Sequence, residues 1–339
     1  MGSKPAAAQG ALNMDRVHRS RNLEIRWGIL MVAAILFTLS LRVDLRPEPA
    51  PPPKEISQQA KISVTTDLVV LPVIVTDSSG GFVSGLRKEN FSIYEEGRIQ
   101  NVTLFAEEDT PVTVGLLVDH SQSMRPKLSA VITAVSTFAH SSNPEDEMFV
   151  VDFSDSVSVE TLGGKTFTSD ARILEKAVSA VSAGGQTALY DAVAEGLRHL
   201  ELGKLEKKAL IIVSDGGDTA SRHKFRDVLN LARQAHAVIY SIGLVGSSEE
   251  ENPRALERLC KDTGGIAFFP HVGQDISNIA KEIARDLREQ YTLGYIPEKK
   301  ADGNSFRKIA VRVDAPGRGK VRVRTRAGYL APAGKISPS

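Results

Sequence analysis

Between residues 111 and 290 the sequence alternates short apolar strands with amphipathic helical segments, and this alternation constrains the fold more than any other feature. Val114–Val118 and Ala209–Val213 are apolar throughout, which is typical of strands buried on both faces of a parallel sheet. The pattern therefore predicts an α/β fold, with a doubly wound, mainly parallel sheet and ligand-binding loops at the carboxyl ends of its strands. Strands are expected at 114–118, 147–153, 156–161, 209–213, 238–244 and 266–269, and helices at 126–140, 170–181, 189–200, 224–235, 254–261 and 276–288.

Oxygen-bearing side chains follow the ends of these strands. Asp119, Ser121 and Ser123 come at alternate positions after the first strand, and Asp215 follows a later one. Thr187 ends a glycine-rich loop between them, just before a predicted helix. Because the carboxyl ends of parallel strands meet at one edge of a sheet, we expect these loops to converge. Carboxylate and hydroxyl oxygens are hard ligands that suit Mg²⁺, Mn²⁺ or Ca²⁺ rather than zinc or copper.

The alternative interpretation is that Asp119 and the two serines form only a turn that caps the next helix. The stretch 114–124 by itself does not separate the two interpretations. The complete set favours a metal site, since two carboxylates neutralise a divalent cation while three hydroxyls leave it electrophilic. Such a cation still seeks an anionic oxygen, and an open coordination position would accept a carboxylate from outside the chain.

The combined arrangement resembles the von Willebrand factor type A domain and its metal ion-dependent adhesion site. The family pattern is Asp-x-Ser-x-Ser, a distant Thr, and a distant Asp followed by Gly. Here it reads Asp119-His-Ser121-Gln-Ser123, Thr187 and Asp215-Gly. The resemblance implies a Rossmann-like domain over 111–290, in which both serines and Thr187 contact the metal directly. It implies that Asp119 and Asp215 bind directly or through water. Mg²⁺ is the expected metal, with Mn²⁺ or Ca²⁺ as alternatives, and an acidic side chain of a protein partner would complete the shell.

We expect the other polar residues and the cysteine to have structural roles. Asp191 and Asp218 are expected to support the ligand loops or to cap helices, because the five-part pattern is already filled. His120 lies between ligands and is expected at the rim, facing the partner or solvent. Cys260 is the single cysteine, so a disulfide framework and a cysteine zinc site are excluded, and we expect a small buried side chain. The histidines without metal-ligand spacing, expected at the surface or in packing, are His199, His223, His236 and His271.

The N-terminal region carries a candidate membrane segment. Residues 1–26 are polar and basic, and they precede a run without charges, Trp27–Leu41. Fifteen helical residues span about 22 Å, short of a hydrocarbon core of about 30 Å. A cleaved signal peptide has an apolar region of this length, but no small-residue cleavage site follows. An uncleaved transmembrane signal anchor over 27–45 is therefore the favoured interpretation.

The charge distribution around this segment predicts the topology. The basic residues lie mostly before it, which keeps the N-terminus in the cytoplasm. The rest of the chain is then expected to be extracytoplasmic, in the periplasm, as a single-pass membrane protein, or secreted if the segment is cleaved. Residues 46–59 are rich in proline and predict a stiff linker between the membrane and the folded part.

Two segments of β-type sequence flank the α/β region. Residues 60–108 and 291–330 contain short runs rich in β-branched residues and turn signals, but each has few residues for an independent core. We therefore predict that they join in one small β-sandwich, with residues 331–339 forming a disordered tail. The expected strands are 61–66, 68–75, 91–94, 100–105, 291–295, 307–313 and 321–326.

The last of these strands, Val321–Arg326, alternates valine or threonine with arginine, so its arginines are expected to face solvent. A face for anionic lipid or an acidic partner is the alternative. The segments Val75–Gly80 and Leu86–Phe91 are similar to those that precede the A domain in a bacterial group of von Willebrand A-related proteins. That resemblance implies the same architecture and an extracytoplasmic location.

Composition and motifs exclude several function classes. The chain has 42 Lys and Arg against 41 Asp and Glu, and it lacks a basic stripe with interleaved aromatics, so no nucleic acid is expected. We find no Ser-His-Asp order on suitable loops, no P-loop, and no paired acids beyond the predicted ligands. An enzyme is therefore not expected, since metal-assisted hydrolysis needs a general base beside an activated water.

The sequence predicts a membrane-anchored extracytoplasmic binding protein. Its partner would be a protein that presents an Asp or Glu carboxylate to Mg²⁺, and it would contact the membrane through residues 27–41. The alternative is a scaffold component of a membrane complex in which the metal is structural. A metal-assisted hydrolase has the least support.

Overall fold

The computed structural model describes residues 68–107, 109–246, 249–271, 275–298 and 305–331. The predicted basic tail, signal anchor, linker and first strand lie outside these residues, and so does the predicted C-terminal tail after its first residue. That residue, Ala331, is buried, and its amide donates to the Ser305 carbonyl at 3.1 Å. Within the described part of the chain, no helix has the length and apolar character needed to cross a membrane.

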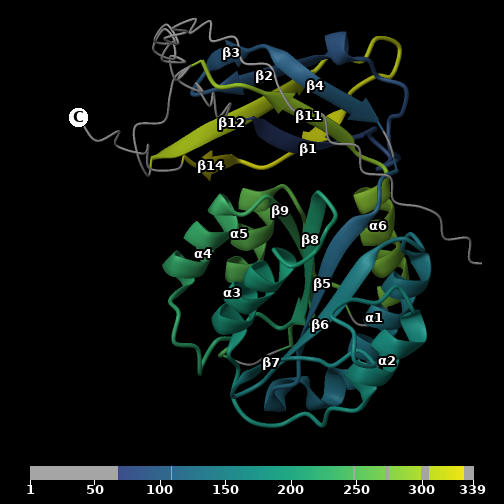
Figure 1. Ribbon diagram of the computed structural model, residues 1–339, viewed down its shortest axis with the longest axis vertical. Coiled ribbons are helices and arrows are strands. Elements are labelled where there is room, and N and C mark those ends of the chain that lie inside the picture. The colour runs from purple at the N-terminus through teal and green to yellow at the C-terminus, as the bar shows by residue number, and fades with distance from the viewer. Residues whose placement is uncertain (1–67, 108, 247–248, 272–274, 299–304, 332–339) are drawn as a thin grey trace, which may run out of the picture. The chain divides into compact units, whose positions relative to one another are not determined.

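A six-stranded sheet forms the centre of the α/β part (Figure 1). Its order is β10-β9-β8-β5-β6-β7, and all neighbouring pairs are parallel except the antiparallel edge pair β6 and β7. β5 (Val112–Asp119) is buried along its whole length, as its apolar sequence predicts. The other strands are β6 (Glu147–Phe153), β7 (Val157–Val159), β8 (Lys207–Ser214), β9 (Ala237–Gly243) and β10 (Ala267–Phe268).

Six α-helices cover this sheet, with α1, α2 and α6 packed on one face and α3, α4 and α5 on the other (Figure 1). The doubly wound, mainly parallel α/β fold predicted from the sequence is thereby confirmed. The helices are α1 (Leu128–Ser141), α2 (Ala171–Ser179), α3 (Leu189–Leu200), α4 (Phe225–Gln234), α5 (Pro253–Thr263) and α6 (Ile276–Arg288), with short 3-10 helices η1 (Lys88–Asn90) and η2 (Gln122–Lys127).

The flanking segments build two antiparallel four-stranded sheets, with orders β13-β1-β11-β4 and β14-β12-β2-β3. Each sheet takes strands from both flanks, and residues of both sheets share one apolar core that includes Leu71, Ile93 and Leu293. The small β-sandwich predicted from the flanks is confirmed, while the predicted domain boundaries stay a prediction. The strands are β1 (Val69–Thr76), β2 (Phe91–Glu95), β3 (Arg98–Gln100), β4 (Val102–Glu107), β11 (Tyr291–Tyr295), β12 (Phe306–Val313), β13 (Arg322–Arg324) and β14 (Gly328–Leu330).

The strand predicted at 100–105 corresponds to β4, which begins at Val102, whereas the short strand β3 before it was not predicted. Glu96 and Gly97 both have positive φ (48° and 77°), which makes a tight hairpin between β2 and β3. β3 ends at Gln100 in the sheet of β2, and β4 begins at Val102 as a partner of β11 in the other sheet.

The prediction that the arginines of 321–326 face solvent is wrong for two of the three. Arg326 is 4% exposed, and its guanidinium donates to the carbonyl oxygens of Gly328 (2.9 Å) and Arg233 (2.6 Å). Arg324 donates to Asp286 in α6. These side chains lie against helices of the α/β part, so a pattern that is typical of a solvated strand face instead forms an interface. The burial lowers the pKa of Arg326 to about 10.

Candidate metal centre

The topology of the sheet brings two of the predicted ligand loops together. β5 ends at Asp119, and its parallel neighbour β8 ends at Ser214, one residue before Asp215. Both carboxylates therefore leave the same edge of the sheet at adjacent positions. Asp119 is 0% exposed and Asp215 is 2% exposed.

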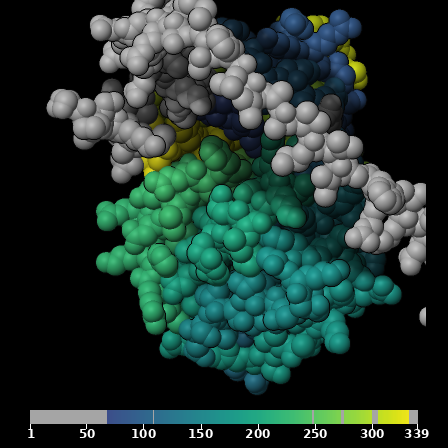
Figure 2. Space-filling view, viewed as in Figure 1, coloured from purple at the N-terminus to yellow at the C-terminus, as the bar shows by residue number. Residues whose placement is uncertain are grey.

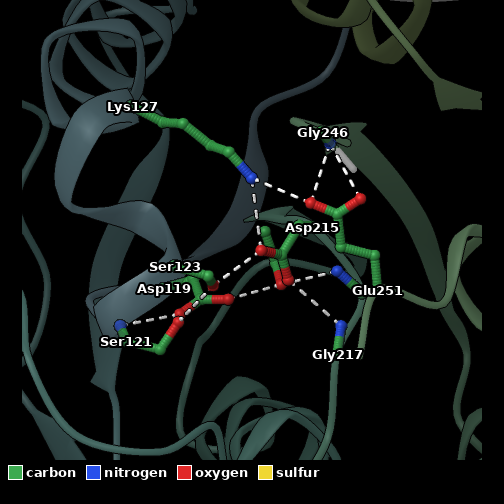
Figure 3. A network of polar contacts seen from close by, with 10 residues as sticks. Asp119, Ser121, Ser123, Lys127, Asp215, Gly217, Gly246 and Glu251 are labelled. Carbon is green, nitrogen blue, oxygen red and sulfur yellow. Dashed lines mark hydrogen bonds and ion pairs between the residues drawn. The ribbon is translucent and has the colours of Figure 1, made fainter. Parts of the chain in front are cut away.

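Hydrogen bonds connect four of the five predicted ligands in a continuous chain (Figure 3). The amide of Ser121 donates to Asp119 Oδ1 at 2.9 Å, and the Ser214 hydroxyl donates to Asp119 Oδ2 at 2.6 Å. The hydroxyls of Ser121 and Ser123 are 3.2 Å apart, and Ser123 donates to Asp215 Oδ2 at 2.7 Å. Two carboxylates and two hydroxyls thus share one small region, as the sequence predicts.

Thr187 is held in a neighbouring loop by its backbone. Its amide donates to Thr219 Oγ1 at 3.0 Å, and its carbonyl accepts from the amides of Thr219 and Ala220. The loop before it is joined to the Asp119 loop, since the Gly184 amide donates to the His120 carbonyl at 2.8 Å. Among the described residues, no hydrogen bond joins the Thr187 hydroxyl to the other four predicted ligands.

Lys127 and Glu251 also belong to this network, and sequence reasoning missed both (Figure 3). The Lys127 Nζ lies 3.3 Å from Asp215 Oδ2 and 3.2 Å from Glu251 Oε1. The Glu251 carboxylate is also fixed by the Gly246 amide, at 2.7 and 2.8 Å from its two oxygens. Lys127 lies four residues after Ser123 in η2, which is a local signal, whereas Glu251 is distant in sequence and has none.

The electrostatics of the site favour an added cation. Burial raises the pKa of Asp119 to about 6, and the nearby charge of Asp215 adds to this, while hydrogen bonds from Ser121 and Ser214 oppose it. The Lys127 ammonium pairs with Asp215, and no ion pair to Asp119 is found in the part of the chain that the structure describes. A divalent cation would offset the cost of keeping Asp119 charged away from water.

The residues present fit a hard divalent cation better than zinc or copper. Within the described ranges, no three His, Cys, Asp or Glu side chains cluster in a way that could hold a metal. The candidate set instead combines two carboxylates with hydroxyls, which is the donor chemistry of Mg²⁺ sites. Asp119, Ser121, Ser123 and Asp215 would hold such an ion, with Thr187 as the fifth candidate.

The neighbouring acids are used in loop contacts. Asp191 accepts from the amides of Arg222 and His223, at 3.0 and 2.9 Å. Asp218 accepts from the Tyr190 amide at 3.0 Å and the Ser221 hydroxyl at 2.6 Å. Both contacts agree with the supporting or capping roles expected from the sequence.

The expectation that His120 faces a partner or solvent is wrong. His120 is 1% exposed, hydrogen bonds through Nδ1 to Asp152 in β6, and places Nε2 3.2 Å from the Val178 carbonyl in α2. Successive side chains of an extended strand point to opposite faces, so the orientation of Asp119 toward the site turns His120 into the helical layer. Cys260 is buried as expected, and burial raises the pKa of its thiol to about 12.

The backbone conformation and the surroundings of residue 216 explain why a glycine follows Asp215. Its φ is +86°, and a Cβ at this position would lie 2.5 Å from the backbone carbonyl oxygen of Asn252. We expect Gly216→Ala to lower the free energy of unfolding by about 2–4 kcal/mol, since backbone strain and a clash with a fixed carbonyl add together. Urea denaturation would measure this. Gly184→Ala is the matched control, because a Cβ there meets nothing within 4 Å, and an equal loss in both variants would contradict the explanation.

Comparison with known proteins agrees with this fold. The family model of the von Willebrand factor type A domain matches residues 114–310. A sequence comparison with curated proteins gives no match.

Three solved structures resemble this chain, each at low sequence identity and with a low TM-score. A von Willebrand factor type A protein from Catenulispora acidiphila is 13% identical, with a TM-score of 0.47 over 79% of this chain and 75% of that chain. An aerotolerance-related membrane protein from Bacteroides fragilis is 15% identical, with a TM-score of 0.44 over 52% of this chain and 98% of that chain. The manganese-loaded TRAP protein of Plasmodium vivax is 14% identical, with a TM-score of 0.42 over 71% of this chain and 99% of that chain.

Structural similarities this distant do not indicate function, so the family assignment depends on the family-model match. That match covers more than half of the chain and includes β5, the helical layers and the loops of the candidate metal centre. The chain therefore belongs to the von Willebrand factor type A domain family.

Proposed function

We propose that this chain is a binding protein whose A domain captures an acidic residue of a protein partner through Mg²⁺. Domains of this family are typically interaction modules rather than enzymes. The observation that supports the proposal is the pairing of two buried carboxylates, Asp119 and Asp215, with serine hydroxyls at the carboxyl edge of the sheet. Mn²⁺ and Ca²⁺ are the alternative ions.

Each residue has a defined part in this proposal. Asp119 and Asp215 supply the negative charge, and Ser121, Ser123 and Thr187 supply neutral oxygens. When bound, the ion supplies a positive charge that attracts a carboxylate. Residues held by hydrogen bonds do not need to reorganise when the partner arrives, so the loop network lowers the entropic cost of capture.

Lys127 is proposed to lower the affinity for the ion, because it places a positive charge against one of the ligands. Its side chain is 21% exposed, so solvent screens part of this repulsion. We expect Lys127→Met to tighten Mg²⁺ binding by roughly tenfold, as measured by calorimetric titration. Arg125→Met is the matched control, since this neighbouring cation of η2 donates to the Ala183 carbonyl and contacts no ligand. Equal or weaker binding by Lys127→Met would argue against the role assigned to Lys127.

Capture of a carboxylate is tested by titrating Mg²⁺ into the protein with and without excess acetate. We expect acetate to tighten Mg²⁺ binding, because a carboxylate would complete the coordination shell. If Mg²⁺ binds equally well in both conditions, the metal is structural and the scaffold alternative is favoured. The baseline is measured by adding acetate to the protein in the presence of a chelator and without Mg²⁺.

The proposed location is extracytoplasmic, with the chain tethered to the membrane through residues 27–41. This proposal depends on the sequence of the N-terminal region. Membrane fractionation of the full chain, followed by protease treatment of intact cells and of cells with a permeabilised outer membrane, would test it. Recovery in the soluble cytoplasmic fraction would contradict the anchor and the topology together.

A further inference from the structure

A groove lies between α5 and the β-sandwich, away from the candidate metal centre. Its volume is about 550 Å³. One wall comes from the C-terminal half of α5 with Arg258, Lys261 and Asp262, and the other comes from β2 and β12. A second cavity of about 350 Å³ shares four of its lining residues, so the two form one continuous depression along β12.

Contacts beside the groove join α4 and α5 to the sandwich segments. The Ala327 amide donates to the Asp262 carbonyl at 3.2 Å, and the Arg326 guanidinium donates to the Arg233 carbonyl at 2.6 Å. The Arg233 guanidinium also lies 4.5 Å from the centre of the Phe306 ring. The groove therefore lies at a place where the helices and the sandwich are in contact.

The groove carries a surplus of positive charge. Lys308 and Arg312 line it from the exposed face of β12, opposite Arg258 and Lys261. The one carboxylate among the lining residues is Asp262, which already pairs with Arg233 at 2.8 Å and with Arg258 at 3.0 Å. The nearby Glu96 carboxylate accepts from the Lys308 amide. Four cations face two acids, so the groove attracts an anion.

Its surface also offers apolar contacts. The rings of Tyr94 and Phe306 line it together with Ala310, and the Arg312 guanidinium lies 5.0 Å from the centre of the Tyr94 ring. Aromatic rings beside cations suit a ligand that combines carboxylates with apolar side chains, such as a peptide, better than a hydrated phosphate chain.

We propose that this groove binds an extended acidic segment of a partner protein. Lys308 and Arg312 are four residues apart on one strand, which separates their backbones by about 13 Å. An extended peptide with acidic residues at positions i and i+4 has the same spacing, and the side chains between them can contact Tyr94 and Phe306. The groove thus recognises acidic residues through fixed cations, without a metal.

This site is independent of the metal centre. The metal-centre loops leave the carboxyl ends of β5 and β8, where Gly216 approaches Asn252 at the start of α5. The groove lies at the opposite end of α5, beside Asp262. A partner that used both sites would bind more tightly than either site alone permits, because the second contact is intramolecular.

The test measures binding of a fluorescent peptide of about eight residues, with glutamates four positions apart and apolar residues between them, to the full chain by fluorescence anisotropy. We expect binding that weakens as salt rises and that a chelator leaves unchanged. A peptide with glutamine at both acidic positions should bind at least about tenfold more weakly.

Charge-reversal variants test whether the acidic peptide binds in the groove. Lys308→Glu and Arg312→Glu should each weaken binding of the acidic peptide by roughly tenfold or more. Lys176→Glu on the exposed face of α2 is the matched control for charge reversal and should bind as the wild type does. Circular dichroism would verify that all variants are folded.

The proposal would be overturned by no binding of the acidic peptide, by equal binding of the glutamine peptide, or by equal weakening in Lys176→Glu. Full competition by heparin together with equal weakening in all three variants would indicate non-specific polyanion attraction instead. Loss of binding on adding a chelator would assign the peptide to the metal centre. Because the groove does not require the ion, an Asp119→Asn variant should keep this binding, so failure of the proposed function and failure of this inference are distinguishable.

Discussion

The Asp119→Asn variant is expected to lose Mg²⁺ binding by more than about 100-fold while it keeps the wild-type fold. The substitution removes one of two negative charges that face the ion. The asparagine amide oxygen can still accept from the Ser121 amide, and its NH₂ group can donate to the Ser214 hydroxyl, which already accepts from the Gly216 amide at 3.0 Å. Since burial disfavours the charge of Asp119, a neutral isostere costs little folding energy.

Calorimetric titration of Mg²⁺ into both proteins measures the effect, and thermal unfolding followed by circular dichroism verifies the fold. Asp218→Asn is the matched control, because this carboxylate lies three residues after Asp215 but is used in contacts with Tyr190 and Ser221. The control should bind Mg²⁺ within about threefold of the wild type. Retention of full Mg²⁺ binding by Asp119→Asn would show that the ion binds elsewhere.

The Glu95→Ala variant is expected to lower the free energy of unfolding by about 3–5 kcal/mol, because it removes one partner of a buried ion pair. Glu95 Oε1 accepts from the Arg307 guanidinium at 2.6 Å, and Oε2 accepts from the hydroxyls of Tyr295 (2.5 Å) and Tyr329 (3.1 Å). Glu95 is 5% exposed and Arg307 is 8% exposed. The network joins strands from both flanks of the chain, so its loss weakens the whole sandwich.

Urea denaturation compares this variant with Glu257→Ala, which removes an exposed glutamate of α5. The control should change the free energy of unfolding by less than about 0.5 kcal/mol. Glu95→Gln should lie between the two, because an amide keeps hydrogen-bonding capacity but not charge. A loss below about 1 kcal/mol in Glu95→Ala would mean that solvent replaces the carboxylate and that the network contributes little.

Local sequence patterns predicted the positions of most helices and strands. α3, α6, β6 and β11 lie where periodicity and apolar runs predict them, because these runs match the burial that each element experiences. The strand predicted at 100–105 is β4, but the sequence did not separate it from β3, which ends at Gln100 and pairs in the other sheet. A strand pattern indicates that a segment pairs, but it does not indicate with which partner.

The same distinction applies to the candidate metal centre. Asp119, Ser121 and Ser123 are local to one loop, and their spacing with Thr187 and Asp215 is visible in the sequence. Glu251 joins the network through Lys127, 124 residues away, and no local pattern marks it. The burial of His120 likewise depends on which helix covers its side of the strand.

By itself the sequence determined the α/β fold class, the flanking β-sandwich, the family and the candidate ligands, because each follows from periodicity or from residues close to a strand end. Only the tertiary structure decided what the charged side chains contact. Arg324 and Arg326 alternate as solvated residues do, yet they pack against α6 and α4. Lys308 and Arg312 alternate in the same way and line a groove. The physical reason is that alternation fixes the face on which a side chain lies, whereas the packing of distant segments determines what covers that face.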